Sequence, residues 1–96
     1  KSLAESGNTL AMEMYLVGLS SGVYGIERNP LEIKRLADLG DMRAMEYYLS
    51  GLAYGSYGFD KNPGEIKRLA DLGNTSAMER YLYGLSYGSY GFEKKS

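Results

Sequence analysis

The chain has 96 residues, of which 44% are hydrophobic and 24% charged, and it contains no cysteine and no histidine. These absences exclude disulfides, zinc–thiolate sites, thiol nucleophiles and histidine-based acid–base catalysis. A formal net charge of −1 gives no general attraction to nucleic acid or to anionic membranes. No apolar run approaches the roughly 20 residues that span a bilayer, so we expect no membrane insertion. The chain shows no signal peptide, and the lack of cysteine suits a bacterial cytoplasm and a periplasm equally, so the localisation stays open.

The chain repeats itself with a period of 33 residues. The two full copies differ at only eight of 33 aligned positions. A period of this length is typical of supersecondary units stacked side by side. We therefore treat residues 1–96 as a single repeat array, with units at 1–28 (partial), 29–61 and 62–96.

In chain order, residues 1–4 match the end of the second helix of a unit. The first helix of the partial copy follows, and we expect Asn8 or Thr9 to cap its start, because both side chains accept a backbone hydrogen bond. A glycine inside this helix costs about 1 kcal/mol relative to alanine. Its recurrence in every copy therefore predicts a close helix–helix crossing. These glycines are Gly18, Gly51 and Gly84.

The next predicted helix begins at Asn29, with Pro30 at its first position and Glu32 assigned to the cap. From Ile33 its apolar residues follow at i, i+3, i+4 and i+7, which gives one apolar stripe. Gly40 is predicted to end the helix in a left-handed conformation. The same signals recur one period later in Asn62, Pro63, Glu65, Ile66 and Gly73.

The first helix of each full copy is predicted to run from Asp41 to about Tyr54, and from Asn74 or Thr75 to about Tyr87. Gly55 and Gly88 stop these helices, and a Gly-Ser-Tyr-Gly-Phe turn leads onward. The predicted fold class is all-α. Its architecture is an α-α superhelix, or solenoid, of about two and a half helix–turn–helix repeats.

The segment Leu-Ala-x-Leu-Gly-x-x-x-Ala-Met, followed by Tyr-Gly-Phe-(Asp/Glu)-Lys, resembles the Sel-one-like repeat (SLR) family, which is related to the tetratricopeptide repeats. The second helix is about one turn shorter than in that family, so the chain resembles a divergent, short version. Ankyrin repeats share the period, but their Thr-Pro-Leu-His first helix is absent. The resemblance implies an α-solenoid that scaffolds protein complexes, often in bacteria. It rests on Ala37, Gly40, Ala44, Leu49, Gly51, Tyr54, Gly58, Phe59 and their copies.

No catalytic, cofactor or metal site is predicted. Ser56 and Lys61 form the best serine–lysine pair, and we interpret them as a turn serine beside a solvated lysine. The glutamates and aspartates of the helices repeat with the unit and are interpreted as structural. The calcium-like loop from Asp60 loses its glycine in the preceding copy. The basic residues share their helices with acidic ones, so nucleic acid is not an expected partner.

The positions that vary most between copies form one stripe on the first helix, spaced i, i+4, i+7 and i+11. Exposed positions that drift freely are expected to become Lys, Glu, Ser or Asn. This stripe carries tyrosine, arginine and apolar residues instead, and tyrosine and arginine are enriched at binding hot spots. We therefore expect it to line a partner-binding groove, although free drift of surface positions is the alternative. The candidate residues are Leu10, Met14, Val17, Arg43, Tyr47, Ser50, Tyr54, Arg80, Tyr83 and Tyr87.

The expected function is a protein–protein interaction scaffold that binds a peptide or protein partner in this groove. The alternative is a bacterial inhibitor, adaptor or immunity-type protein that blocks one specific partner, and a hydrolase is a distant third. The last helix lacks a following helix to cover Met78, Tyr81, Leu82 and Leu85. We therefore expect either a longer parent array or self-association through uncapped repeat ends.

Overall fold

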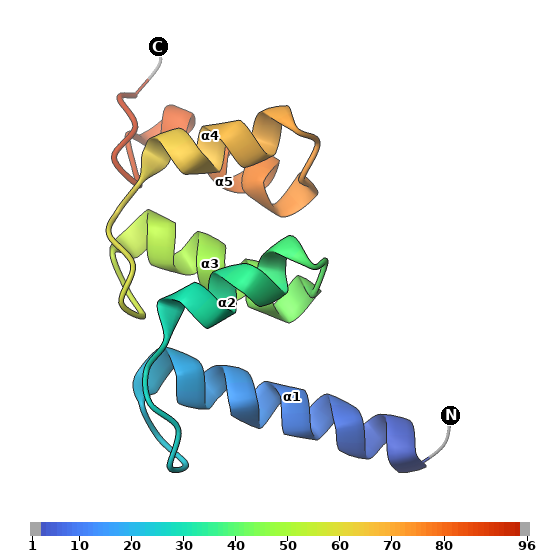
Figure 1. Cartoon of the computed structure of the whole chain (residues 1–96). Coiled ribbons are helices and arrows are strands. Elements are labelled where there is room, and N and C mark those ends of the chain that lie inside the picture. The colour runs from blue at the N-terminus through green and yellow to red at the C-terminus, as the bar shows by residue number, and fades with distance from the viewer. Residues whose placement is uncertain (1–2, 95–96) are drawn as a thin grey trace.

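The computed structural model describes the backbone of residues 3–94 and the side chains of residues 9–94. Within this range the chain consists of helices and turns with no strand, so the predicted all-α class is confirmed. The helices are α1 (Leu3–Ser21), α2 (Pro30–Asp38), α3 (Met42–Tyr54), α4 (Pro63–Asp71) and α5 (Thr75–Tyr87). The pairs α2–α3 and α4–α5 lie one above the other, with the longer α1 beneath them (Figure 1).

The helix starts follow the predicted caps. The Asn29 side chain accepts a hydrogen bond of 3.2 Å from the Glu32 N–H, and Asp41 accepts one of 2.8 Å from the Ala44 N–H. Asn62 and Asn74 do the same for α4 and α5, at 3.2 and 2.8 Å. Each cap satisfies a backbone donor that has no partner inside its helix, which fixes where the helix begins.

The helix ends also follow the predicted glycines. Gly40 has φ +98°, and Gly73 has φ +97°. The Gly40 N–H donates to Ala37 O at 3.0 Å, and the Asp41 N–H donates to Leu36 O at 3.1 Å. This pair of bonds is a Schellman motif, which needs a left-handed residue that only glycine adopts without strain. It reverses the chain from α2 directly into α3.

The predicted start of the first helix is wrong. Neither Asn8 nor Thr9 begins a helix, because α1 runs without interruption from Leu3. In the full copies, packing of a complete second helix against the next helix supports the break at Gly40. In the partial copy the helix continues through the equivalent glycine, Gly7, because extending an existing helix is cheaper than starting a new one. Lys1 and Ser2, at the start of the predicted tail, lie outside the described residues.

The core is one cluster to which every helix contributes. Helix α3 lies at its centre and contacts every other helix of the described chain. The apolar stripes predicted from periodicity supply the buried side chains. Those buried completely, with 0% exposure, are Leu16, Ile33, Ala44, Leu49, Ile66 and Ala77.

The glycines inside the first helices serve a purpose different from the predicted helix–helix crossing. A Cβ on Gly51 would collide with the Phe59 ring and lie 2.9 Å from Ser56 O. Gly84 makes the same approach to Phe92, and Gly18 approaches Ile26. The close neighbour is thus the turn that follows the helix. The chain reverses after the helix, and an apolar side chain of the turn packs against the helical glycine.

Candidate functional site

The variable stripe lies at the surface and gathers at two junctions, one between α1 and α3 and one between α3 and α5. Five of its members line the hollows at these junctions, whereas Leu10 and Met14 lie apart from both on α1 and are 58% and 45% exposed. The other exposed members are Arg43, Tyr54, Tyr83 and Tyr87, and the half-buried members are Val17, Tyr47, Ser50 and Arg80.

The α1–α3 junction holds a hollow of about 430 Å³ that Val17, Arg43 and Tyr47 line together with glutamates. The Arg43 Nε lies 3.3 Å from Oε1 of Glu13 on α1. The Tyr47 ring contacts Tyr57 edge-on, with centroids 5.2 Å apart. Besides being a candidate binding residue, Arg43 thus forms an ion pair that links α3 to α1.

The α3–α5 junction repeats this arrangement with more polar contacts. Arg80 donates from Nη2 to Ser50 Oγ at 3.1 Å, and the same Nη2 lies 3.5 Å from Oε1 of Glu46. Ser76 donates to Oε2 of Glu46 at 2.6 Å. These residues adjoin a hollow of about 220 Å³ that Tyr83 and Tyr90 also line. Arg80 and Ser50 therefore hold two helices in register, which fixes the surface on which the tyrosines stand.

Four tyrosines meet beside this junction and form what we call the tyrosine cluster: Tyr54, Tyr83, Tyr87 and Tyr90. The Tyr90 ring packs against Tyr54 and Tyr83, with centroids 5.4 and 5.5 Å apart. The Tyr54 and Tyr90 hydroxyls lie 3.4 Å apart, and their hydrogen bond, together with partial burial, raises the pKa of Tyr90. The Tyr83 and Tyr87 rings lie 4.7 Å apart. Three of the four rings line a shallow groove of about 530 Å³ that Lys61 also borders.

Tyr57 and Tyr90 are not among the predicted site residues, because the sequence pattern places them in a connecting turn. Both have φ +60°, as does Tyr24 in the partial copy. Tyr57 and Gly58 are the central residues of a type I′ turn, closed by a 3.0 Å hydrogen bond from the Phe59 N–H to Ser56 O. A left-handed tyrosine costs about 1–2 kcal/mol. The sequence does contain a sign of this role. All three copies keep a tyrosine before the turn glycine, at a position where asparagine or glycine is favoured.

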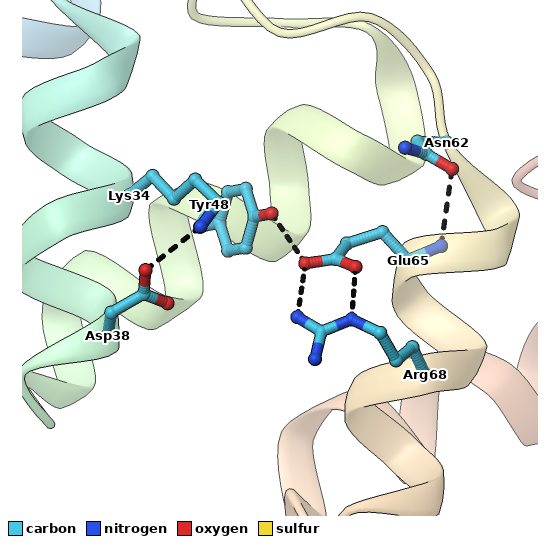
Figure 2. A network of polar contacts seen from close by, with 6 residues as sticks. All are labelled: Lys34, Asp38, Tyr48, Asn62, Glu65 and Arg68. Atoms are coloured by element: carbon cyan, nitrogen blue, oxygen red, sulfur yellow. Dashed lines mark hydrogen bonds and ion pairs between the residues drawn. The ribbon is translucent and has the colours of Figure 1, made fainter.

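A second polar network joins α3 to α4 (Figure 2). The Tyr48 hydroxyl donates to Oε2 of Glu65 at 2.7 Å, and Arg68 donates to both Glu65 oxygens at 2.6 and 2.7 Å. Lys34 lies 5.9 Å from the centroid of the Tyr48 ring. Hydrogen bonding from Arg68 lowers the pKa of Glu65, while burial raises the pKa of Tyr48.

The network corrects the assignment of Glu32 and Glu65 to helix caps. The Asn62 N–H, which such a cap would use, already donates to Leu52 O at 2.8 Å, and the Asn29 N–H donates to Leu19 O at the same distance. The two carboxylates are therefore free to bind an arginine on their own helix and a tyrosine on the preceding first helix. They link helices together.

Comparisons with protein-family models, curated proteins and solved structures found no match to this chain. In the part of the chain that the structure describes, no helix combines the length and apolar character needed to cross a membrane. Nor do the side chains of residues 9–94 bring together three or more carboxylates as a metal site would require.

Proposed function

We propose that this protein is a protein–protein interaction scaffold that binds an extended peptide segment of a partner across α3 and α5. We further propose that it is built as a short α-solenoid of the Sel-one-like type. The observation that carries the binding proposal is the tyrosine cluster, in which Tyr54, Tyr83 and Tyr87 are 60%, 50% and 66% exposed.

The chemistry of the cluster supports binding to protein. Tyrosine offers a large apolar ring and a hydroxyl that donates and accepts, and fixing its two side-chain torsions loses little entropy. Clustered aromatic residues are where binding energy concentrates in protein interfaces. The groove of about 530 Å³ beside the cluster has room for the side chains of an extended segment.

The rigidity of the surface supports the same proposal. Arg80 and Ser76 on α5 both bind Glu46 on α3, so the two helices that carry the tyrosines are fixed relative to each other. Tyr90 is held in a strained left-handed conformation between Tyr54 and Tyr83. Contacts with two neighbouring rings keep Tyr90 in this conformation, and an ordered surface loses less entropy on binding.

A random peptide library displayed on phage, selected on the immobilised 96-residue chain, tests this proposal. We expect enriched peptides that bind the chain and lose at least tenfold in affinity to the Tyr54→Ala/Tyr87→Ala variant. The matched control is Leu31→Ala, which removes a side chain that is 77% exposed on α2. Peptides that bind the double variant as well as the parent chain would exclude the tyrosine cluster as the site.

The stability of the double variant must be measured alongside its binding. Because Tyr54 and Tyr87 are exposed, we expect the midpoint of thermal unfolding to stay nearly unchanged. Unfolding of the double variant would show that the two tyrosines belong to the core, and the groove proposal would then fail.

A further inference from the structure

One apolar face of α5 is far more exposed than the same face of α1 and α3. Leu16, Leu49 and Leu82 occupy equivalent positions in the three copies, and they are 0%, 0% and 62% exposed. Met78 is 40% exposed, whereas its equivalents Met12 and Met45 pack partly buried against the core. With the half-buried Tyr81 and Leu85, these residues form what we call the α5 apolar face.

The chain itself shows what covers this face in the other copies. Helix α2 follows α1 and packs against it, and α4 follows and packs against α3. Each brings an isoleucine, Ile33 or Ile66, that is 0% exposed. Within residues 3–94 no equivalent helix follows α5. Leu82 is therefore exposed at a surface that, in the other copies, packs against a helix of this type.

The polar half of the same interface is also present on α5. The hydroxyls of Tyr15 and Tyr48 donate to Glu32 on α2 and to Glu65 on α4, at 3.2 and 2.7 Å. Tyr81 is the equivalent residue of α5, and Lys67 lies 6.0 Å from its ring centroid, as Lys34 lies 5.9 Å from that of Tyr48. In Figure 2 the Tyr48 ring lies between Lys34 on one helix and Glu65 on another. Within the described chain, Tyr81 thus has the lysine contact of this arrangement but no glutamate that accepts a hydrogen bond from its hydroxyl.

We propose that the α5 apolar face docks one amphipathic helix that has the chemistry of α4. That helix has an asparagine as its N-cap and a proline at its first position. A glutamate occupies the third helical position, and the sequence continues as Ile-x-x-Leu-Ala. Its isoleucine covers Leu82, and its glutamate accepts a hydrogen bond from the Tyr81 hydroxyl. This inference is independent of the tyrosine cluster, because it concerns a different face of α5 and a helical ligand.

A second copy of this chain does not provide such a helix. The apolar stripes of α2 and α4 are already used, since Ile33 and Ile66 are 0% exposed and Ala37 is 3% exposed. Freeing either helix for another molecule would expose the core of its own copy.

Stacking α1 of a second copy on α5 is disfavoured by charge. At each described junction a glutamate meets an arginine of the next first helix, as Glu13 meets Arg43 and Glu46 meets Arg80. By the same spacing Glu79 would face positions 10 and 14 of the second copy, which are Leu10 and Met14. A carboxylate covered by apolar side chains without a cation loses solvation and gains no partner.

Fluorescence anisotropy of a labelled peptide with the sequence of residues 62–73, titrated with the full chain, tests the proposal. We expect saturable binding that Leu82→Lys weakens at least tenfold and Tyr81→Phe weakens about threefold, the loss of about one hydrogen bond. Leu10→Lys, at a leucine of similar exposure, and Tyr54→Ala/Tyr87→Ala serve as controls and should leave binding within about twofold. A peptide with lysine in place of its isoleucine should not bind.

A second arm removes the cost of ordering a short free helix, which is marginal in water at this length. The sequence of residues 62–73 is fused directly after Lys94, which reproduces the spacing between Lys61 and Asn62. We expect the midpoint of thermal unfolding to rise by about 5 °C and Leu82→Lys to abolish the gain. Failure of both arms, or responses that Leu82→Lys leaves unchanged, would overturn the proposal. Sedimentation showing a dimer of the unfused chain that Leu82→Lys dissociates would also overturn it, in favour of a second copy.

Discussion

The Tyr48 hydroxyl on α3 donates a 2.7 Å hydrogen bond to Glu65 on α4, and it does so with its ring almost fully buried. A single phenol thereby joins two successive copies, because its ring packs within the core while its hydroxyl reaches a carboxylate 17 residues along the chain. The carboxylate in turn is held by Arg68 from the same helix.

Removal of this hydroxyl is expected to destabilise the chain. Tyr48→Phe keeps the ring and deletes one hydrogen bond to a charged acceptor, so the free energy of unfolding should fall by about 1.5 kcal/mol. Urea denaturation followed by circular dichroism measures the change. The control is Tyr15→Phe, whose more exposed hydroxyl lies 3.2 Å from Glu32 and should matter less. Equal effects of the two substitutions would contradict a special role for the buried pair.

The stability of the chain should fall in acid through Glu65. Hydrogen bonding from Arg68 lowers the pKa of Glu65 in the folded chain below its ordinary value of 4.5. Its contribution to stability is therefore present above pH 4.5 and is lost as the pH falls through the folded-state value. Thermal unfolding between pH 7 and pH 2 should show this loss, and Glu65→Gln should flatten the profile in that window. An unchanged acid limb in Glu65→Gln would show that other carboxylates dominate.

Gly51→Ala is expected to destabilise the chain by about 2 kcal/mol, although alanine is the better helix former. The reason is the collision of the new methyl group with the Phe59 ring and with Ser56 O. Gly64→Ala is the matched control. It places a methyl group 3.5 Å from Asn62 Oδ1 in helix α4, and should be neutral or slightly stabilising. In denaturant unfolding, the midpoint should therefore fall for Gly51→Ala and stay unchanged or rise slightly for Gly64→Ala.

Tyr24→Asn is expected to stabilise the chain by about 0.5–1 kcal/mol. Tyr24 occupies the first central position of a type I′ turn at φ +60°, followed by Gly25 at φ +73°, and its side chain is 63% exposed. Asparagine before glycine is the pair that this turn prefers, so the substitution relieves strain without removing a buried side chain. The same change at Tyr90 also removes the ring contacts with Tyr54 and Tyr83, so its gain should be smaller or reversed. A decrease in stability for Tyr24→Asn would show that the tyrosine makes contacts that outweigh the strain.

The local features of the fold could be predicted from the sequence. Asn29, Asp41 and Gly40 set helix boundaries through backbone hydrogen bonds to residues within five positions, and such bonds depend on little beyond the residues themselves. The one wrong boundary, at the start of α1, is instructive. Asn8 has the same capping chemistry as Asp41, yet α1 continues past it, because a break between two helices also depends on how they pack against each other, as α2 and α3 do.

The candidate site likewise has a part that the sequence predicts and a part that it does not. The stripe of variable positions could be read from spacing, because helical periodicity alone decides which residues share a face. Its partners could not be read in this way, since Tyr54 meets Tyr90 across 36 positions and Arg80 meets Ser50 across 30. Such contacts depend on how far and at what angle one helix docks on another, which is set by the packing of the whole core.

The sequence by itself determined the helices after α1, their asparagine and aspartate caps and the apolar stripe of each, because these follow from interactions within one or two turns of chain. The tertiary structure decided what each repeated residue does. Leu49 and Leu82 lie in nearly the same local sequence, yet one is 0% and the other 62% exposed. The difference comes from the presence of α4 on one and the absence of an equivalent helix on the other within the described chain, and burial depends on neighbours in space.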